Sequence, residues 1–454
     1  MPVRPSSPVA SARLTQWGAS VVPLLLVVAC GGSAGHRVSK DAAQSTPTVF
    51  DVGSGVRPLS AEAKSLRAKG ASGLVEVLKR YDELSPSDPR RSATADLVDE
   101  VAQQRDATSS RLFWYTDIEE AKKVSAATRK PILSLRMLGS LTDEFSCANS
   151  RFFRAILYPD ARIRRLLEQD FVLHWSSERP APLITIDFRD GRKVTRTITG
   201  NSIHYVLSAN GEPIEAMPGL VSQNTFATWL EGTHRLHERF LASNGDRAIV
   251  VDHHRAALAT GSASYNTLAR RAGVSAALPL SSAPTPSVNL PSAALAIPVA
   301  PSKAVVEAPL ARAAVNAPDK YDAPSTLETI PWQRFVPFFK DDATLSADGT
   351  RGLRRKNPQN WSNPEAPRSL TDAEFQEMVE AFQTSLAEDT AKNTLGLYNV
   401  IHSWFLATDA PRSFNEWNTR VYSTLFLTPK SDPWLGLVPA RAFSGLERDG
   451  IQAK

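Results

Sequence analysis

Residues 130–138 read Lys-Pro-Ile-Leu-Ser-Leu-Arg-Met-Leu, and the seven residues after the proline form the strongest structural signal in this sequence. A short, nearly continuous apolar run that follows a helix-breaking proline is typical of a buried strand. We therefore predict a core strand over 132–138 and examine the chain outward from it.

Helical patterns lie on both sides of this strand. The segment Thr116 to Glu119 has the spacing of a capping box, which predicts a helix that begins there and continues to about Thr128. After the strand, a polar loop leads to helical stretches from Cys147 to about 157 and from 161 to 168, separated by a proline. A second core strand is predicted at 171–175.

Two hairpins and a closing helix follow the second strand. The predicted strands 183–188 and 193–198 flank Asp190-Gly191, and the strands 203–207 and 213–217 flank Asn210-Gly211. Both dipeptides favour tight hairpin turns. An amphipathic helix is predicted over 222–239. This alternation of strands and helices indicates an α/β sandwich domain.

The rest of the chain divides by composition. Eight prolines lie between 279 and 318, which predicts an extended linker, and a capping box at Thr371–Glu374 begins a mostly helical region. The expected regions are a signal peptide at 1–29, a flexible tether at 30–58, a helical lead-in at 59–110, the α/β domain at 111–240, a helical extension at 241–278, a Pro/Ala/Ser-rich linker at 279–331 and a helical C-terminal domain at 332–454. In the lead-in, Leu74, Val75, Val77, Leu78 and Tyr81 form one apolar stripe.

Cys30, the first of the two cysteines, follows the residue order of an export signal: basic residues, then an apolar run at 21–28, then small residues. The run is much shorter than the roughly 20 residues that span a bilayer. Val27-Val28-Ala29-Cys30 resembles a bacterial lipobox, which implies that Cys30 carries the lipid. No acidic residue directly follows Cys30, and in this feature the sequence resembles lipoproteins of the outer membrane. We therefore expect the protein on the periplasmic side of that membrane. An ordinary cleaved signal with an incidental cysteine is the alternative.

The region 111–240 resembles the thioredoxin superfamily in the order of its motifs. The matching residues are, in order, Trp114, Asp117, Lys130-Pro131, the strand 132–138, Cys147-Ala148-Asn149-Ser150, Leu157-Tyr158-Pro159-Asp160 and Phe171-Val172. The resemblance implies a thioredoxin-like sandwich with Cys147 as the nucleophile. Ser150 replaces the second cysteine of the family motif, and Ser202 stands at the position of the family's cis-proline. Because a cis bond before a residue other than proline costs about 2.5–4 kcal/mol, we expect that peptide to be trans.

Two functions remain open for Cys147. A thiol at a helix N-terminus favours the thiolate, and Ser150 could donate a hydrogen bond to it, so monothiol thiol–disulfide exchange with an external thiol or protein disulfide is possible. The docking loop at Ser202 would then contact the partner. The alternative is a redox-inactive interaction module of the cell envelope, in which Cys147 only packs, as buried cysteines commonly do.

Other residue patterns give weaker hypotheses. His234, His237, His253 and His254, with Glu238 and Asp252, could form a metal site, but solvated histidines at helix ends explain them more simply. Asp187, Asp190, Asp341 and Asp342 suit hairpins and loops better than catalysis. Trp332, Phe335, Phe338 and Phe339 suit core packing better than ligand binding. We therefore assign no metal and no cofactor from the sequence.

The composition limits the classes of partner molecule that we expect for this protein. The chain has 454 residues, 42% hydrophobic and 22% charged, which excludes wholesale disorder and a polytopic membrane protein. The net charge of the chain is +5, and two of its positive charges, Arg4 and Arg13, lie in the predicted signal peptide. The sequence has no basic run that is interleaved with aromatic residues. We therefore expect no nucleic acid partner, and membrane contact only through the N-terminal lipid.

Overall fold

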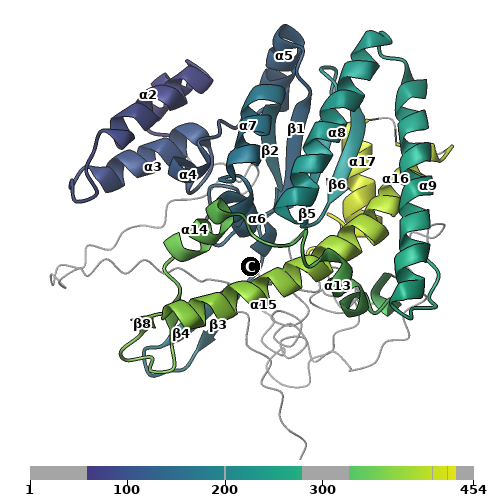
Figure 1. Cartoon of the computed structure of the whole chain (residues 1–454). Helices are drawn as coiled ribbons and strands as arrows, with labels where there is room; N and C mark the ends of the chain where they lie inside the picture. The colour runs from purple at the N-terminus through teal and green to yellow at the C-terminus, as the bar shows by residue number, and fades with distance from the viewer. Residues whose placement is uncertain are drawn as a thin grey trace, which may run out of the picture.

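A computed structural model describes residues 59–198, 201–278, 327–408, 410–411, 413–426 and 428–435 (Figure 1). The predicted signal peptide, the tether with Cys30 and residues 279–326 of the predicted linker lie outside the described residues. Within the described ranges, no helix combines the length and the apolarity that a membrane crossing requires.

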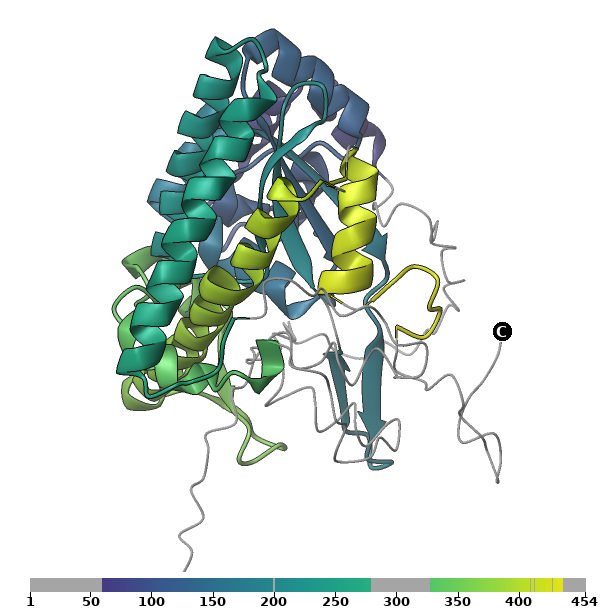
Figure 2. The same cartoon turned by 90° about the vertical axis from the view of Figure 1, so that its right-hand side faces the viewer.

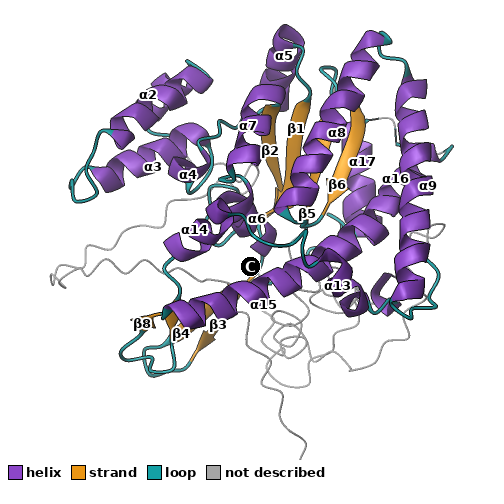
Figure 3. Cartoon of the chain, in the orientation of Figure 1, coloured by secondary structure: helices purple, strands orange, loops and turns teal. Residues whose placement is uncertain are grey.

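The centre of the molecule is a four-stranded sheet (Figure 3). Its strands, in spatial order, are β2 (Val172–Arg179), β1 (Ile132–Leu138), β5 (Ser202–Leu207) and β6 (Pro213–Pro218). Strands β1 and β2 are parallel, whereas β5 pairs antiparallel with both β1 and β6. The bounds of β1 are those predicted, because its side chains are buried on both faces. The mixed α/β class is thereby confirmed.

Helices cover both faces of this sheet. They are α5 (Ile118–Thr128), α6 (Ala148–Phe152), the π-helical turn η1 (Phe153–Leu157), α7 (Ala161–Asp170), α8 (Gln223–Ala242) and α9 (Arg247–Arg271). Successive residues of a strand point to opposite faces. His204 of β5 contacts Phe226 of α8, whereas the adjacent Tyr205 contacts Phe414 in the C-terminal region. Helix α8 and the helix α17 (Phe414–Arg420) therefore cover opposite faces.

The helix starts follow local capping chemistry, with one difference from the prediction. The N-cap of α5 is Asp117, whose side chain accepts a hydrogen bond from the Glu119 amide, and not Thr116. An aspartate satisfies the orphan amides of a first turn as well as a threonine does, so the helix begins one residue later. Ser222 caps α8 in the same way.

The helical lead-in has a core of its own. It consists of α1 (Ala61–Arg67), α2 (Ala71–Asp82), α3 (Arg91–Ala102) and α4 (Ala107–Ser110). Leu74, Val77 and Leu78 are buried in this core, but Val75 is 66% exposed, so its predicted place in the apolar stripe is wrong. At about 100° of rotation per residue, position 75 lies outside the arc of the helix surface that Leu74, Val77, Leu78 and Tyr81 occupy.

The C-terminal region is mostly helical, as predicted. Its elements are η3 (Leu327–Thr329), η4 (Trp332–Phe335), α13 (Val336–Phe339), α14 (Ala347–Arg355), α15 (Asp372–Lys392), η5 (Asn393–Leu397), α16 (Tyr398–Leu406), α17 (Phe414–Arg420) and η6 (Val421–Leu425), with a short ladder of β7 (Gln359–Asn360) and β8 (Arg368–Ser369). Its buried residues join those of the sheet in one hydrophobic cluster. Leu327 and Ile330, which the sequence placed in the linker, belong to that cluster.

A two-stranded hairpin extends away from the main sheet (Figure 2). It pairs β3 (Leu183–Asp187) with β4 (Lys193–Thr197), as the sequence predicted. Gly191 has a φ of +95°, a conformation that a glycine adopts without steric cost, which is why the turn forms there.

Candidate functional site

Cys147 lies where the loop after β1 enters α6. It is the N-cap residue of that short helix, and its side chain has no accessible surface. The predicted position at a helix N-terminus is therefore present, but the thiol is enclosed. A thiol in this state does not meet a disulfide in solution unless the surrounding structure opens.

The three predicted site residues lie together. Asn149 Nδ2 donates a hydrogen bond of 2.9 Å to Ser202 Oγ, which joins the Cys147 motif to β5. Ser202 is the first residue of that strand and not part of a loop as predicted, because it pairs with Met137 of β1. Ser150 Oγ accepts a hydrogen bond of 2.9 Å from Ser146 Oγ. Asn149, Ser150 and Ser202 are all buried, and the peptide between Asn201 and Ser202 is trans. The site therefore consists of neutral, internally paired groups.

Two tyrosines stand close to the Cys147 thiol. Burial raises the pKa of Tyr158 and of Tyr422 well above 10, and the Cys147 thiol contributes to both shifts. Tyr422 belongs to η6, and its hydroxyl donates a hydrogen bond of 3.2 Å to the carbonyl oxygen of Asn201. A residue of the C-terminal region thus contacts the residue that directly precedes Ser202.

The chain after Tyr422 continues across the end of β2. We call residues 421–426 and 428–435 the C-terminal strap. Arg179, the last residue of β2, donates hydrogen bonds of 2.7 Å and 2.8 Å to the carbonyl oxygens of Asp432 and Pro433. Lys430 forms an ion pair of 3.3 Å with Glu178. The strap is therefore held to the end of the sheet where the parallel strands β1 and β2 finish, which is the end that Cys147 follows.

Arg154, which lies one helical turn beyond the Cys147 motif, is engaged with other groups. Arg154 is 1% exposed, and it donates a hydrogen bond of 3.1 Å to the carbonyl oxygen of Glu144. Burial lowers the pKa of the Arg154 guanidinium, and Asp106, 3.9 Å away, opposes that shift. Asp106 in turn pairs with Lys356 of the C-terminal region at 2.6 Å. These ions hold η1, the lead-in and the end of α14 together.

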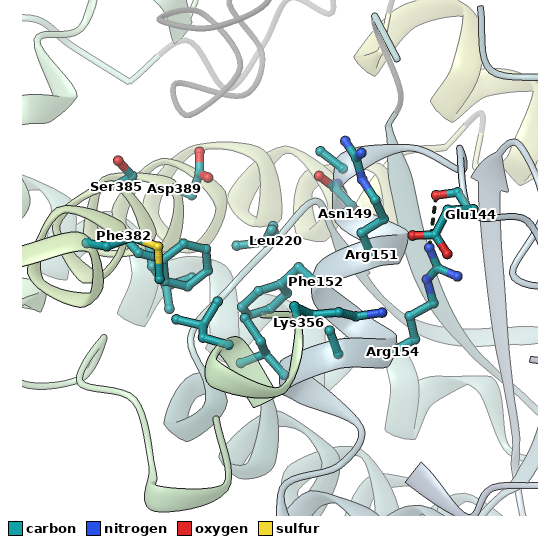
Figure 4. A pocket seen from close by; sticks show the side chains of 16 residues that line it. Glu144, Asn149, Arg151, Phe152, Arg154, Leu220, Lys356, Phe382, Ser385 and Asp389 are labelled. Carbon is teal, nitrogen blue, oxygen red and sulfur yellow. Dashed lines mark hydrogen bonds between the residues drawn. The ribbon is translucent and has the colours of Figure 1, made fainter. Parts of the chain in front are cut away.

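A small apolar cavity lies beside the Cys147 motif (Figure 4). Its volume is about 100 Å³, enough for a few methyl groups but well below the ~300 Å³ or more of a drug-sized ligand pocket. Phe152, Leu353 and Phe382 line it from three different elements, and Arg151, Lys356 and Asp389 stand at its rim. The cavity separates α6 from α14 and α15.

A second cluster of chemically active groups lies at β6, the edge strand of the sheet. Glu215 of β6, His254 of α9 and His402 of α16 are all buried, and one ligand-type atom from each lies within 4.8 Å of the others. His254 Nδ1 and His402 Nδ1 are 2.7 Å apart, and His254 Nε2 is 3.1 Å from the carbonyl oxygen of Ile214.

The carboxylate of Glu215 accepts three hydrogen bonds. Its Oε2 accepts from His253 Nε2 at 2.9 Å and from the Tyr398 hydroxyl at 3.0 Å, and its Oε1 accepts from the Ala216 amide at 2.8 Å. Burial alone would raise the pKa of Glu215, but the neighbouring histidines outweigh it and lower the pKa to about 2. Burial lowers the pKa of His254 to about 4 and that of His402 to about 3. At neutral pH this is a buried carboxylate beside the neutral imidazoles of His254 and His402.

The π-helical turns coincide with both clusters. Turn η1 follows α6 directly, η5 precedes Tyr398 and His402, and η6 carries Tyr422. Such turns widen a helix locally and occur frequently at functional sites.

The sequence did not indicate the Glu215 cluster. It grouped His253 and His254 with His234, His237, Glu238 and Asp252, but His234 pairs with Glu238 on its own helix at 3.5 Å. Glu215 and His402 join the histidines only through tertiary packing. One signal was present: Glu215 is a charged residue inside a short, otherwise apolar predicted strand, and buried charges need partners.

The remaining candidates have structural roles. Asp187 and Asp190 pair with Lys193 and Arg192 in the β3–β4 hairpin. Asp342 accepts hydrogen bonds from Ser222 and Thr225 at the start of α8. Trp332 and Phe335 are buried in the core, against which Phe339 packs, whereas Phe338 lies under Arg271.

Comparisons with protein-family models, with curated proteins and with solved structures find no match to this chain.

Proposed function

We propose that this protein is an exported, lipid-anchored, thioredoxin-like module that acts by binding in the cell envelope, and that Cys147 has no redox cycle. The thioredoxin-like part is supported by the element order. Strand β1, the Cys147 motif, α6, β2, the β5–β6 hairpin that begins at Ser202, and α8 follow one another as the superfamily resemblance implies.

The observation that carries the redox-inactive part is the enclosure of Cys147. Its side chain is 0% exposed, and Tyr422 of the C-terminal strap contacts the neighbouring loop. Thiol–disulfide exchange requires the attacking sulfur to approach a second sulfur in line, which an enclosed thiol cannot do. The hydrogen-bonded serines at 146, 150 and 202 also leave the motif without the second thiol that would release a mixed disulfide.

Alkylation of the single thiol tests this proposal. In a Cys30→Ser background, iodoacetamide should label Cys147 at least about a hundredfold more slowly in buffer than in urea, because labelling needs an opening of the structure. The same protein should not accelerate the reduction of insulin by dithiothreitol. Labelling in buffer at the rate found in urea would contradict the proposal.

Monothiol exchange is the second candidate function, and one observation favours it. Cys147 is an N-cap residue whose motif is hydrogen-bonded to Ser202, the position that the resemblance assigns to partner docking. It would operate only if the strap moves away. Fast labelling of Cys147 together with insulin reduction that is lost in Cys147→Ser would support this candidate against the first.

The anchor is tested separately. Wild-type protein should sediment with membranes, and Cys30→Ser should appear in the soluble fraction of the same cells. Cys147→Ser is the matched control and should stay with the membranes. Retention of Cys30→Ser would contradict lipid attachment at Cys30.

A further inference from the structure

Glu215, His254 and His402 come from three elements on both sides of the predicted linker, and they meet in the core. Glu215 lies on β6 and His254 on α9, before the linker, whereas His402 lies on α16, after it. We propose that these three side chains bind a divalent transition metal ion, with Zn²⁺ as the reference ion, and that the ion fastens the C-terminal region to the edge of the sheet.

The residue types and their number suit this ion. Zinc binds imidazole nitrogen and carboxylate oxygen, and two histidines with one glutamate are a known three-residue set that leaves a fourth position for water. Each of the three residues supplies one ligand atom within 4.8 Å of the others. All three are buried, so the ion would be shielded from bulk water.

The orientation of His254 fixes which of its nitrogens can bind. Its Nε2 lies 3.1 Å from the carbonyl oxygen of Ile214, an acceptor only, so Nε2 carries the hydrogen. The lone pair is then on Nδ1, which points toward His402. A metal-bound histidine normally donates its other N–H to a carbonyl or a carboxylate in this way. His402 binds through Nδ1 when it carries its hydrogen on Nε2.

The distances require a small expansion. Ligands about 2.0–2.1 Å from a tetrahedral ion are about 3.4 Å from one another. The two Nδ1 atoms, at 2.7 Å, must separate by about 0.7 Å. Glu215, the third ligand, already offers a carboxylate oxygen within 4.8 Å of a ligand nitrogen of each histidine. In the arrangement described, the two rings share one hydrogen bond, and the ion would take its place.

The surroundings of Glu215 are those of a supported ligand. His253 and the Tyr398 hydroxyl both donate hydrogen bonds to Oε2, and the Ala216 amide donates to Oε1. Such contacts orient a ligating carboxylate. A carboxylate with no exposed surface is also costly to bury, and a cation in contact with it offsets that cost.

Metal titration of the tag-free mature protein tests the site. After treatment with a chelator, the protein should bind one equivalent of Zn²⁺ in competition with a chromophoric chelator. Its thermal midpoint should rise with Zn²⁺ concentration, because a ligand that binds only the folded state stabilises it. Co²⁺ should bind to the same site and give the visible absorption of a four-coordinate ion.

Matched variants assign the ligands. His402→Asn should weaken Zn²⁺ binding at least tenfold and abolish the thermal shift, whereas His234→Gln and Cys147→Ser should bind as the wild type does. If His402→Asn does not fold, the Co²⁺ spectrum of the wild-type protein still decides. A wild type that binds no metal, or equal weakening in His234→Gln, would overturn the proposal.

Discussion

The hydroxyl of Tyr422 donates a hydrogen bond of 3.2 Å to the carbonyl oxygen of Asn201, although 221 residues separate them in sequence. Asn201 directly precedes Ser202, the residue to which Asn149 of the Cys147 motif donates. The C-terminal strap is therefore part of the wall around the thiol, and what happens to the strap determines whether Cys147 can react.

We expect Tyr422→Phe to destabilise the protein by about 1 kcal/mol and to speed alkylation of Cys147 about fivefold, since the lost hydrogen bond favours opening of the strap. Tyr265→Phe is the control, because Tyr265 donates a comparable hydrogen bond of 2.7 Å to Ala276. It should cost similar stability, measured by urea unfolding, and leave the alkylation rate unchanged. Equal alkylation rates in the two variants would show that the strap does not control access to the Cys147 thiol.

Arg179→Met should loosen the strap at its other end. The variant keeps the apolar stem of Arg179 but removes its hydrogen bonds to Asp432 and Pro433. Amides at 428–435 should lose about tenfold or more in protection against hydrogen exchange, measured by mass spectrometry. Arg192→Met removes an ion pair confined to the exposed hairpin and should change nothing at the strap. Unchanged protection in Arg179→Met would contradict this role.

The pair Asn149 and Ser202 should be energetically coupled. Each alanine substitution leaves a buried polar partner, so each should cost about 1–3 kcal/mol, and the double variant should cost less than the sum by about 1 kcal/mol. Urea unfolding of the four proteins gives the coupling energy. The exposed pair Thr185 and Thr195, with hydroxyls 3.0 Å apart, should show a coupling of only a few tenths of a kcal/mol. Additive losses at 149 and 202 would refute the contact.

Much of the fold was predictable because its signals are local. Strand β1, both hairpins and the capping box at Thr371 depend on residues within a few positions of one another. The start of α5 was missed by one residue, because Thr116 and Asp117 both suit an N-cap.

The site could be predicted only in part, because its decisive contacts are long-range. The sequence placed Cys147 at a helix N-terminus and Ser202 in a nearby loop. Nothing near Tyr422 indicates that it packs against Asn201, and nothing near His402 indicates that it meets His254. Such contacts arise when two elements pack, and a periodic pattern gives the face of an element but not its partner.

Buried histidines should make the protein sensitive to acid. Burial lowers the pKa of His174 to about 3, with a further contribution from Arg136, and burial lowers that of His204 to about 3. Below pH 6.5 the unfolded chain binds these protons and the folded protein does not. The contribution of these two neutral rings to the free energy of unfolding should therefore be fully present above pH 6.5. It should fall by about 1.4 kcal/mol per pH unit for each histidine down to about pH 3.

Urea unfolding between pH 7.5 and 4.5 measures this dependence. His174→Gln should reduce the slope of the free energy of unfolding against pH by the contribution of one proton. Ser134→Ala removes the 2.8 Å hydrogen bond to the His174 ring but keeps the ring buried, so it should lower stability without changing the slope as much. Parallel curves for wild type and His174→Gln would show that His174 titrates alike in both states.

Two glycine substitutions should have opposite effects on stability. A Cβ at Gly352 of α14 would lie 2.2 Å from the carbonyl oxygen of Ala155 in η1, so Gly352→Ala must push the two elements apart. We expect a loss on the order of 2–4 kcal/mol, because backbone cannot yield as a flexible side chain does. At Gly232, inside α8, the nearest atom to such a Cβ is 4.0 Å away, so Gly232→Ala should gain about 0.5–1 kcal/mol from helix propensity. Thermal and urea unfolding measure both changes. If Gly352→Ala left the free energy of unfolding unchanged, α14 would not pack against η1, the turn that follows the Cys147 motif. The C-terminal region would then enclose the thiol less tightly than the contacts at Tyr422 and Arg179 require.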